Sequence, residues 1–292
     1  MKTAEEFFTR AEKILETLEL LLPQERDQEL KSALAWKWRK GKYFSELEAI
    51  TDLNQIDLDD LLHVNRQKTT LEQNTKQFLE DLPANNALLW GPRGTGKSSL
   101  VRALLNGYVD KGLRLIEVDR HDLVDLPEII QRIKSEKFKF IIYCDDLSFN
   151  EDDETYRALK TVLDGSVRAT PKNVLIYATS NRRHLLPENQ QDNQKSQVIN
   201  GELHLDEAIE EKISLSERFG LWLSFHPLDQ LRYLDIVNHW LAAFGASENQ
   251  IRGAKKEALQ WALSRGSRSG RSANQFARDW LGRSKLKDIE SY

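Results

Sequence analysis

The 292-residue chain contains only one cysteine, one methionine and seven prolines, and the low cysteine content excludes some classes of protein. The single Cys144 cannot form an intramolecular disulfide, and the six histidines lack the cysteine neighbours that zinc sites use. Apolar runs such as Phe140–Cys144 fall far short of the roughly 20 residues that a membrane helix requires. The start MKTAEEFF is too acidic for a signal peptide. We therefore expect a cytoplasmic protein with no membrane segment.

The composition is typical of a globular protein with a charged, helix-rich surface. Hydrophobic residues make up 40 % of the chain and charged residues 30 %, and the mean hydropathy is −0.58. The length allows one large α/β domain with smaller attachments. The net charge of −4 hides a basic C-terminal part, because residues 252–287 carry ten positive and two negative side chains. Such a run could meet phosphates or face solvent, and a solvated helical face is the commoner case.

Periodicity divides the chain into three regions. Residues 1–62 place apolar side chains at helical spacing, and their Trp36 and Trp38, set among basic residues, suit either helix packing or nucleic-acid contact. Residues 63–226 contain short apolar runs typical of parallel strands, and within them the polar segment 187–206 predicts a surface loop. Residues 227–292 return to helical spacing. The five runs are ALLW (87–90), LRLIEV (113–118), FIIYC (140–144), NVLIYA (173–178) and LWLSF (221–225).

The sharpest motif directly follows the first run and fits the pattern G-x-x-x-x-G-K-[ST]. Its glycines allow backbone N–H groups to converge on phosphates, and the next helix points its positive N-terminal end at them. Lys97 supplies a point charge for the β- and γ-phosphates, and Ser98 offers a hydroxyl to Mg²⁺. The predicted nucleotide-binding residues are Gly91, Pro92, Arg93, Gly94, Thr95, Gly96, Lys97, Ser98 and Ser99.

Two carboxylates end the run FIIYC and supply the acidic element that such a loop needs. Asp145 is the candidate ligand of the metal ion. Asp146 stands where a group that positions the attacking water would lie, although Asp is one methylene shorter than the more usual Glu. A helix cap is the structural alternative for Asp146. Glu154 is the spare candidate for the same role and is otherwise a surface residue.

Five segments in this order resemble a known family: QKTTLEQNTKQFLEDLPANNALLWGPRGTGKSSLVRALL (67–105), FIIYCDDLSF, YATSNRRHL, SLSERFGLWLSF and SGRSANQFARDW. Over about residues 65–285 the chain resembles the AAA+ ATPases, and it is most similar to a bacterial family of predicted AAA+ ATP-binding proteins catalogued as domain of unknown function 815. The resemblance implies an α/β fold of the P-loop NTPase class with a parallel five-stranded sheet flanked by helices. The expected divisions are a helical N-terminal region (1–62), a nucleotide-binding domain (63–226) and a helical lid (227–292).

The resemblance also implies roles for residues outside the loop. Asn181 matches the sensor 1 residue, which orients the attacking water, and an Asn in this place is otherwise a turn residue. Arg218 matches the arginine finger that acts on the neighbouring subunit's nucleotide, and it is otherwise an ion-pair partner of Glu217. Arg271 matches the lid arginine called sensor 2, with Arg268 as an alternative that spacing does not exclude.

Together these features predict an ATPase that binds ATP with Mg²⁺ and drives conformational change in an oligomer or on a macromolecular client. An arginine finger acting between subunits implies a homo-oligomer, for which a closed ring such as a hexamer is the natural solution. Two other functions stay open: a P-loop kinase, and an ATP-gated scaffold or loader on nucleic acid that hydrolyses little. No [NT]-K-x-D motif supports a GTPase, and the sequence does not indicate whether the client is protein or nucleic acid.

Overall fold

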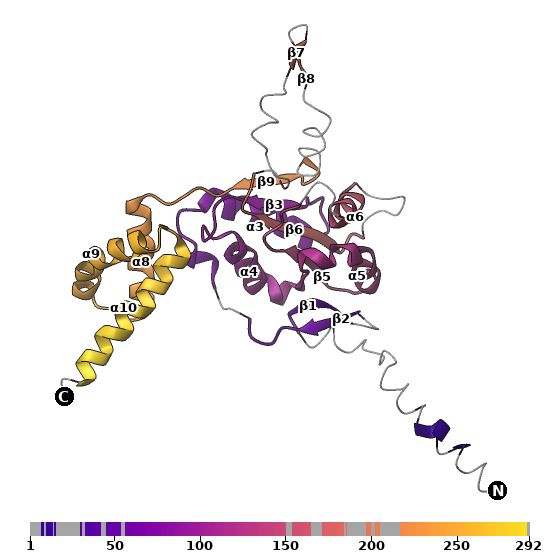
Figure 1. The fold of residues 1–292 in the computed structure, drawn as a ribbon, viewed down its shortest axis with the longest axis horizontal. Helices are drawn as coiled ribbons and strands as arrows, with labels where there is room; N and C mark the ends of the chain where they lie inside the picture. The colour runs from indigo at the N-terminus through magenta and orange to yellow at the C-terminus, as the bar shows by residue number, and fades with distance from the viewer. Residues whose placement is uncertain are drawn as a thin grey trace.

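Figure 1 shows the fold in a computed structural model, which describes residues 33–41, 45–53, 56–149, 154–164, 171–183, 197–199, 202–204 and 217–290, together with positions 7, 8, 10–13, 15, 30 and 185. A seven-stranded sheet lies at the centre, and helices cover both of its faces. A separate group of helices lies beside the sheet. The architecture is therefore a three-layer α/β structure with an attached helical bundle.

Five parallel strands form the body of the sheet, in the order β4-β5-β6-β3-β9. Each of the five predicted runs forms one of these strands, so the prediction of a parallel five-stranded body is confirmed. The register pairs Ile142 of β5 with Ile176 of β6. The bounds are β3 (Ala87–Trp90), β4 (Leu113–Glu117), β5 (Lys139–Cys144), β6 (Val174–Ser180) and β9 (Leu221–Ser224).

The strands are apolar on both faces because each face carries its own layer of helices. Along β5, Ile141 and Tyr143 face one core, whereas Phe140, Ile142 and Cys144 face the other. The first core is covered by α3 (Asn65–Leu79) and α4 (Lys97–Tyr108), and the second by α5 (Leu126–Ile133), α6 (Glu154–Leu163) and the short helix η3 (Arg120–Asp125). The short helices η1 (Leu58–Asp60) and η2 (Val109–Lys111) precede α3 and β4.

Residues 35–49 differ from the helical N-terminal region that periodicity predicts, because they form two strands. β1 (Ala35–Lys40) pairs parallel to β4, and β2 (Ser45–Ala49) pairs antiparallel to β1, so the sheet has seven strands rather than five. Trp36 and Trp38 are fully buried in one core. Their spacing of two is strand periodicity, which the helical spacing of the preceding residues conceals. Because both rings are buried, they do not form the surface patch that nucleic-acid contact would require.

A second difference falls in the segment 187–206, which the sequence predicts to be a loop. β7 (Gln197–Ile199) and β8 (Glu202–His204) form an antiparallel pair there. The pair contains only three apolar residues, Val198, Ile199 and Leu203, which is too few to form a recognisable strand run. The rest of that segment lies outside the described residues.

The bundle beside the sheet contains α8 (Gln230–Ala243), α9 (Glu248–Ser264) and α10 (Gly270–Glu290), in the region where helical spacing is predicted. It has its own core, in which Tyr233, Ala258 and Phe276 are buried. Side-chain caps fix where two of these helices begin: Asp229 accepts a hydrogen bond from the N–H of Arg232, and Ser247 heads a capping box on α9. Across the described residues, every helix is too short or too polar to traverse a lipid bilayer.

Trp36→Ala is expected to lower the free energy of unfolding by about 3–5 kcal/mol, because it removes a fully buried ring that packs against Phe140. Arg39→Ala is the control on the same strand. Its side chain is exposed and forms a surface ion pair with Glu48, so stability should stay close to wild type. Urea unfolding followed by circular dichroism measures both variants. A Trp36→Ala protein as stable as Arg39→Ala would contradict the place of β1 in the sheet.

Candidate nucleotide-binding site

Three loops meet at the carboxyl edge of the sheet, where the adjacent strands β5, β6 and β3 end. The 91–98 loop joins β3 to α4, Asp145 and Asp146 follow β5, and Asn181 follows β6. Parallel pairing thus brings together residues that lie far apart in the chain. Ligands of open α/β sheets bind at such an edge, so the topology makes this the candidate site.

Two glycines let the 91–98 loop approach its neighbours closely. A Cβ on Gly91 would lie 2.1 Å from the carbonyl oxygen of Phe225, directly after β9. Gly94 has φ +76°, and a Cβ there would lie 2.8 Å from the side chain of Ser269, directly before α10. The loop is therefore held between the end of the sheet and the helical bundle. Within it, the Thr95 hydroxyl donates a hydrogen bond to the carbonyl of Pro92, at 2.9 Å.

Ser98 and Asp145, the predicted metal-side residues, lie in contact. The Ser98 hydroxyl donates a 2.9 Å hydrogen bond to Oδ1 of Asp145, and the Thr179 hydroxyl donates to the same oxygen. Burial alone would raise the pKa of Asp145, but these hydroxyls stabilise its charged form and the pKa lies below its usual value. Asp145 is therefore an ionised oxygen donor beside a hydroxyl, a combination that suits Mg²⁺.

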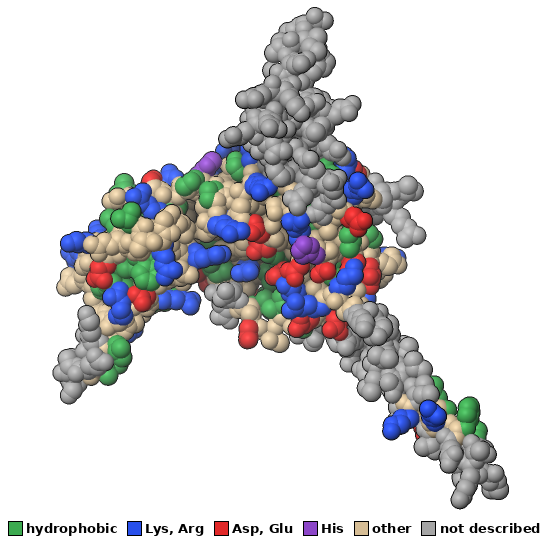
Figure 2. All heavy atoms as spheres, viewed as in Figure 1, with side chains coloured by type: hydrophobic (Ala, Val, Ile, Leu, Met, Phe, Trp, Pro, Cys, Tyr) green, Lys and Arg blue, Asp and Glu red, His purple; other side chains and the backbone are tan. Residues whose placement is uncertain are grey.

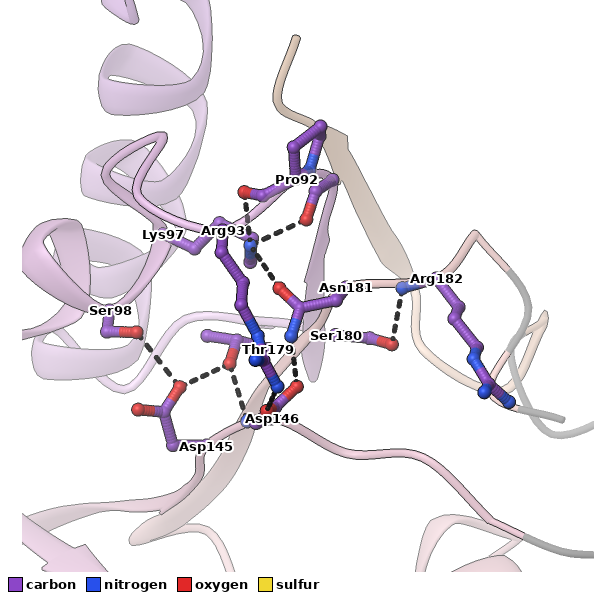
Figure 3. Close-up of polar contacts among 11 residues, drawn as sticks. Pro92, Arg93, Lys97, Ser98, Asp145, Asp146, Thr179, Ser180, Asn181 and Arg182 are labelled. Atoms are coloured by element: carbon purple, nitrogen blue, oxygen red, sulfur yellow. Dashed lines mark hydrogen bonds and ion pairs between the residues drawn. The ribbon is translucent and has the colours of Figure 1, made fainter. Parts of the chain in front are cut away.

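Lys97, Asn181, Asp146 and Arg93 form a chain of contacts beside this pair (Figure 3). The Lys97 ammonium donates to two carbonyl groups of its own loop, at 2.6 and 2.9 Å, and to Oδ1 of Asn181 at 3.2 Å. The Asn181 amide donates to Asp146, and the Arg93 guanidinium pairs with the same carboxylate at 2.9 Å. The structure thus brings the predicted Lys, sensor Asn and second Asp into one network.

Thr179 is a site residue that sequence reasoning misses. Its hydroxyl donates to the Asp145 carboxylate and accepts a 2.9 Å hydrogen bond from the backbone N–H of Asp146. Asp146 has φ 54°, an uncommon conformation that costs a non-glycine residue about 1–3 kcal/mol. Thr179 therefore fixes both aspartates. The signal that could have found it is a hydroxyl side chain near the end of an otherwise apolar strand.

Lys97 is the most buried charge of the loop, with 6 % of the residue exposed. Burial lowers the pKa of Lys97, the nearby Asp145 and Asp146 partly counter this effect, and the cations Arg93 and Arg271 lower the pKa further. Three cations therefore lie close to two carboxylates. This balance leaves positive charge at the loop, which favours an anionic ligand.

The start of α10 docks on the loop. The N–H of Gly270 donates a 2.8 Å hydrogen bond to the carbonyl of Gly94. A pocket beside this contact is lined by Arg93, Arg271, Ser269 and Ser272 among others, and Figure 2 shows Lys and Arg side chains along the junction of the bundle and the sheet layers. Of the two candidates for the lid arginine, Arg271 lines this pocket, whereas Arg268 is exposed outside its lining.

Two predicted candidates lie away from the loop. Glu154 is the exposed first residue of α6. Arg218 precedes the parallel strand β9, which places it at the amino edge of the sheet, and its guanidinium pairs with Asp164 at the end of α6. The four residues of β9 span about 13 Å, and Arg218 lies beyond the amino end of this strand. Arg218 and the 91–98 loop therefore lie at opposite edges of the sheet.

The sheet order and the loop at the end of β3 define the class: this is a P-loop fold of the AAA+ type. The chain is similar to the Thermotoga maritima RuvB Holliday junction branch migration motor, with a TM-score of 0.51 and 14 % identity over 80 % of this chain and 67 % of that chain. It is also similar to a proline-to-glycine point mutant of Thermotoga maritima RuvB, with a TM-score of 0.52 and 14 % identity over 80 % and 68 % of the two chains. At this identity the likeness shows the fold alone.

Residues 31–284 match the model of the family described as "Protein of unknown function (DUF815)". The chain belongs to this family, and the family prediction from its motifs is confirmed. No curated protein matches the chain.

Gly94→Ala is expected to lower the free energy of unfolding by at least about 1–2 kcal/mol, because alanine is strained at φ +76° and its methyl would press on Ser269. Gly107→Ala is the matched control. Gly107 lies in α4 and a methyl there would meet only the Leu58 side chain at 3.9 Å, so stability should rise by up to about 1 kcal/mol. Urea unfolding compares the two variants, and equal effects would contradict the docking of α10 on the loop.

Proposed function

We propose that this chain is a Mg²⁺-dependent ATPase. The main support is that two sets of contacts lie side by side at the 91–98 loop. Ser98 contacts Asp145, and Lys97 contacts Asn181, which in turn contacts Asp146. The first offers oxygen donors to a cation. The second places a cation next to an amide and a carboxylate that could hold water. Phosphoryl transfer needs both, because its catalysis consists mainly of positioning and charge stabilisation.

The residues fit ATP with Mg²⁺. Lys97 and the backbone N–H groups at the start of α4 would bind the phosphates, since Gly96 is the N-cap of that helix. Ser98 and Asp145 would hold Mg²⁺, which uses few protein ligands and otherwise takes water and phosphate oxygens. When bound, Mg²⁺ neutralises charge on the phosphate oxygens.

Asp146 and Asn181 would position the attacking water. In the structure, the Asp146 carboxylate is engaged by both Arg93 and Asn181. The Arg93 guanidinium occupies Oδ2 of Asp146 and the Asn181 amide occupies Oδ1, so Arg93 has to leave before Oδ2 can hold the attacking water. The phosphates, which compete for the same guanidinium, would draw it away. Arg93 thereby links nucleotide binding to the ability of Asp146 to hold the attacking water.

We extend the proposal to action between subunits. Arg218 lies at the sheet edge opposite its own loop, so any contact of Arg218 with a nucleotide requires a neighbouring copy. Such a contact joins different surfaces of the two copies, and a ring, for example of six, closes the series. The bundle that starts after residue 227 has its own core and would act as the lid. The nucleotide-binding domain would combine residues 63–226 with the edge strands β1 and β2.

Lys97→Ala and Asp146→Asn should separate binding from turnover. Lys97→Ala removes the charge that meets the phosphates, so ATP affinity should fall at least tenfold while the fold is kept. Asp146→Asn keeps the phosphate and metal residues, so ATP should bind with near wild-type affinity but turn over at least about 100-fold more slowly. Titration with a fluorescent ATP analogue and phosphate release, with and without DNA, measure the two effects.

Glu154→Gln is the control for Asp146→Asn, since Glu154 is exposed and lies away from the loop. It should hydrolyse ATP like the wild type. Normal turnover by Asp146→Asn together with loss in Glu154→Gln would reverse the assignment. Transfer of phosphate to a small acceptor instead of water would identify a kinase, and tight ATP binding with little turnover would identify a scaffold.

Arg218→Ala should bind ATP almost normally but lose about 10³–10⁵ in hydrolysis rate, as removal of arginine fingers does. Mixing it with Lys97→Ala should restore activity, because a Lys97→Ala subunit offers Arg218 while an Arg218→Ala subunit keeps its pocket. Phosphate release from mixed and separate variants is the measurement, with subunit exchange verified independently.

Asp164→Asn is the matched control for Arg218, because it breaks the same ion pair but keeps the arginine. It should hydrolyse ATP close to the wild-type rate. An equal loss in Asp164→Asn and Arg218→Ala would mean that the ion pair has a structural role only. Full activity of a strictly monomeric protein would refute action between subunits.

A further inference from the structure

Tyr143 carries a buried hydroxyl to which none of the proposed steps assigns a role. It lies on β5 two residues before Asp145, and both side chains lie toward α4: Tyr143 packs in the core beneath that helix, and Asp145 accepts from its Ser98. The residue is 0 % exposed, and its hydroxyl has no hydrogen-bond partner among the described residues. Buried polar groups in folded proteins are nearly always hydrogen-bonded, so this hydroxyl requires a physical explanation.

The neighbouring strand supplies a matched tyrosine. Tyr177 of β6 is the register partner of Tyr143, is equally buried and packs in the same core. Its hydroxyl is hydrogen-bonded to Asn74 and Thr75 of α3, at 3.0 and 2.9 Å. The hydroxyl of Tyr177 is therefore hydrogen-bonded within the protein, whereas that of the adjacent Tyr143 has no partner among the described residues.

The groups beside the Tyr143 hydroxyl are those of the metal-side pair. Asp145 and Ser98 lie beside the Tyr143 hydroxyl and influence its ionisation, but neither meets it in hydrogen-bond geometry, and the two hydrogen-bond to each other. A tyrosine hydroxyl carries one proton and two lone pairs. It can both donate and accept a hydrogen bond.

We propose that Tyr143 is a positioning residue for the divalent cation: its hydroxyl hydrogen-bonds to a water of the hydrated Mg²⁺ held by Ser98 and Asp145. The inference rests on the proposed function. Mg²⁺ keeps several of its waters in protein sites, and those waters need hydrogen-bond partners. A phenylalanine would fill the same core without burying a hydroxyl, so packing alone does not account for tyrosine at this position.

Tyr143→Phe tests the proposal because it removes only the hydroxyl. Binding of a fluorescent ATP analogue is measured in EDTA and across a Mg²⁺ titration of the full-length protein. Affinity in EDTA should match the wild type, whereas the Mg²⁺ concentration for half-maximal effect should rise about tenfold, as loss of a group around a metal ligand does. Electron paramagnetic resonance of bound Mn²⁺, which replaces Mg²⁺, should show the same loss of affinity directly.

Tyr177→Phe is the matched control. It breaks the hydrogen bonds to Asn74 and Thr75 and should lower the thermal midpoint, with a wild-type Mg²⁺ titration. Tyr143→Phe should unfold no earlier than the wild type, because no protein hydrogen bond is lost. In an Asp145→Asn background, where the cation site is already weakened, Tyr143→Phe should have no further effect on the Mg²⁺ titration.

A wild-type Mg²⁺ titration in Tyr143→Phe, or an equal shift in Tyr177→Phe, would overturn this proposal while leaving the ATPase proposal intact. Failure of the wild type to bind the ATP analogue would instead defeat the proposed function. In that case Mn²⁺ binding without nucleotide, compared between wild type and Tyr143→Phe, still decides the role of the hydroxyl, and equal affinities would refute it.

Discussion

The parallel alignment of β5, β6 and β3 is the constraint on which the rest of the site depends. Because these adjacent strands end at one edge, the residues that follow them are forced into contact and have to satisfy one another. Lys97 bonds to Asn181 and to carbonyls of its loop, and Asp145 accepts from Ser98 and Thr179. Lys97 and Thr179 are buried, and an unpaired polar group there is costly, so these contacts hold the side chains in place ahead of any ligand.

Among the described residues, the helical bundle contacts the loop at this edge and also the segment before α3. The N–H of Gly270 bonds to the loop at Gly94, and α8 contacts the segment before α3 through the pairs His239–Asp60 and His63–Asp235. The first contact lies at the loop itself, whereas the second lies outside it. A shift of the loop would therefore act on one anchor of the bundle and leave the other in place, which is the geometry of a hinged element.

What the sequence predicts correctly rests on local patterns. Short apolar runs suffice for the five-stranded body, and the glycine and lysine spacing suffices for the loop. Trp36 and Trp38 mislead because one strand of six residues follows a long helical pattern and shows too few repeats of its own period. Thr179, the Arg93–Asp146 pair and the contact of Gly270 with Gly94 join distant segments, so they depend on tertiary structure and leave no pattern in neighbouring residues.

The two aspartates differ in how firmly they are held, and this difference matters for the proposed function. Asp145 is fixed by two hydroxyl groups, one of them on the neighbouring strand, and its place does not depend on a mobile charge. Asp146 is 49 % exposed at its side chain, and its partner Arg93 is 75 % exposed. An ion pair so open to water contributes little free energy, so exchanging the carboxylate for a phosphate costs Arg93 little. Under the proposed function, the residues for the metal would therefore be in place before ATP binds, whereas the residues for the water would become competent only in response to ATP.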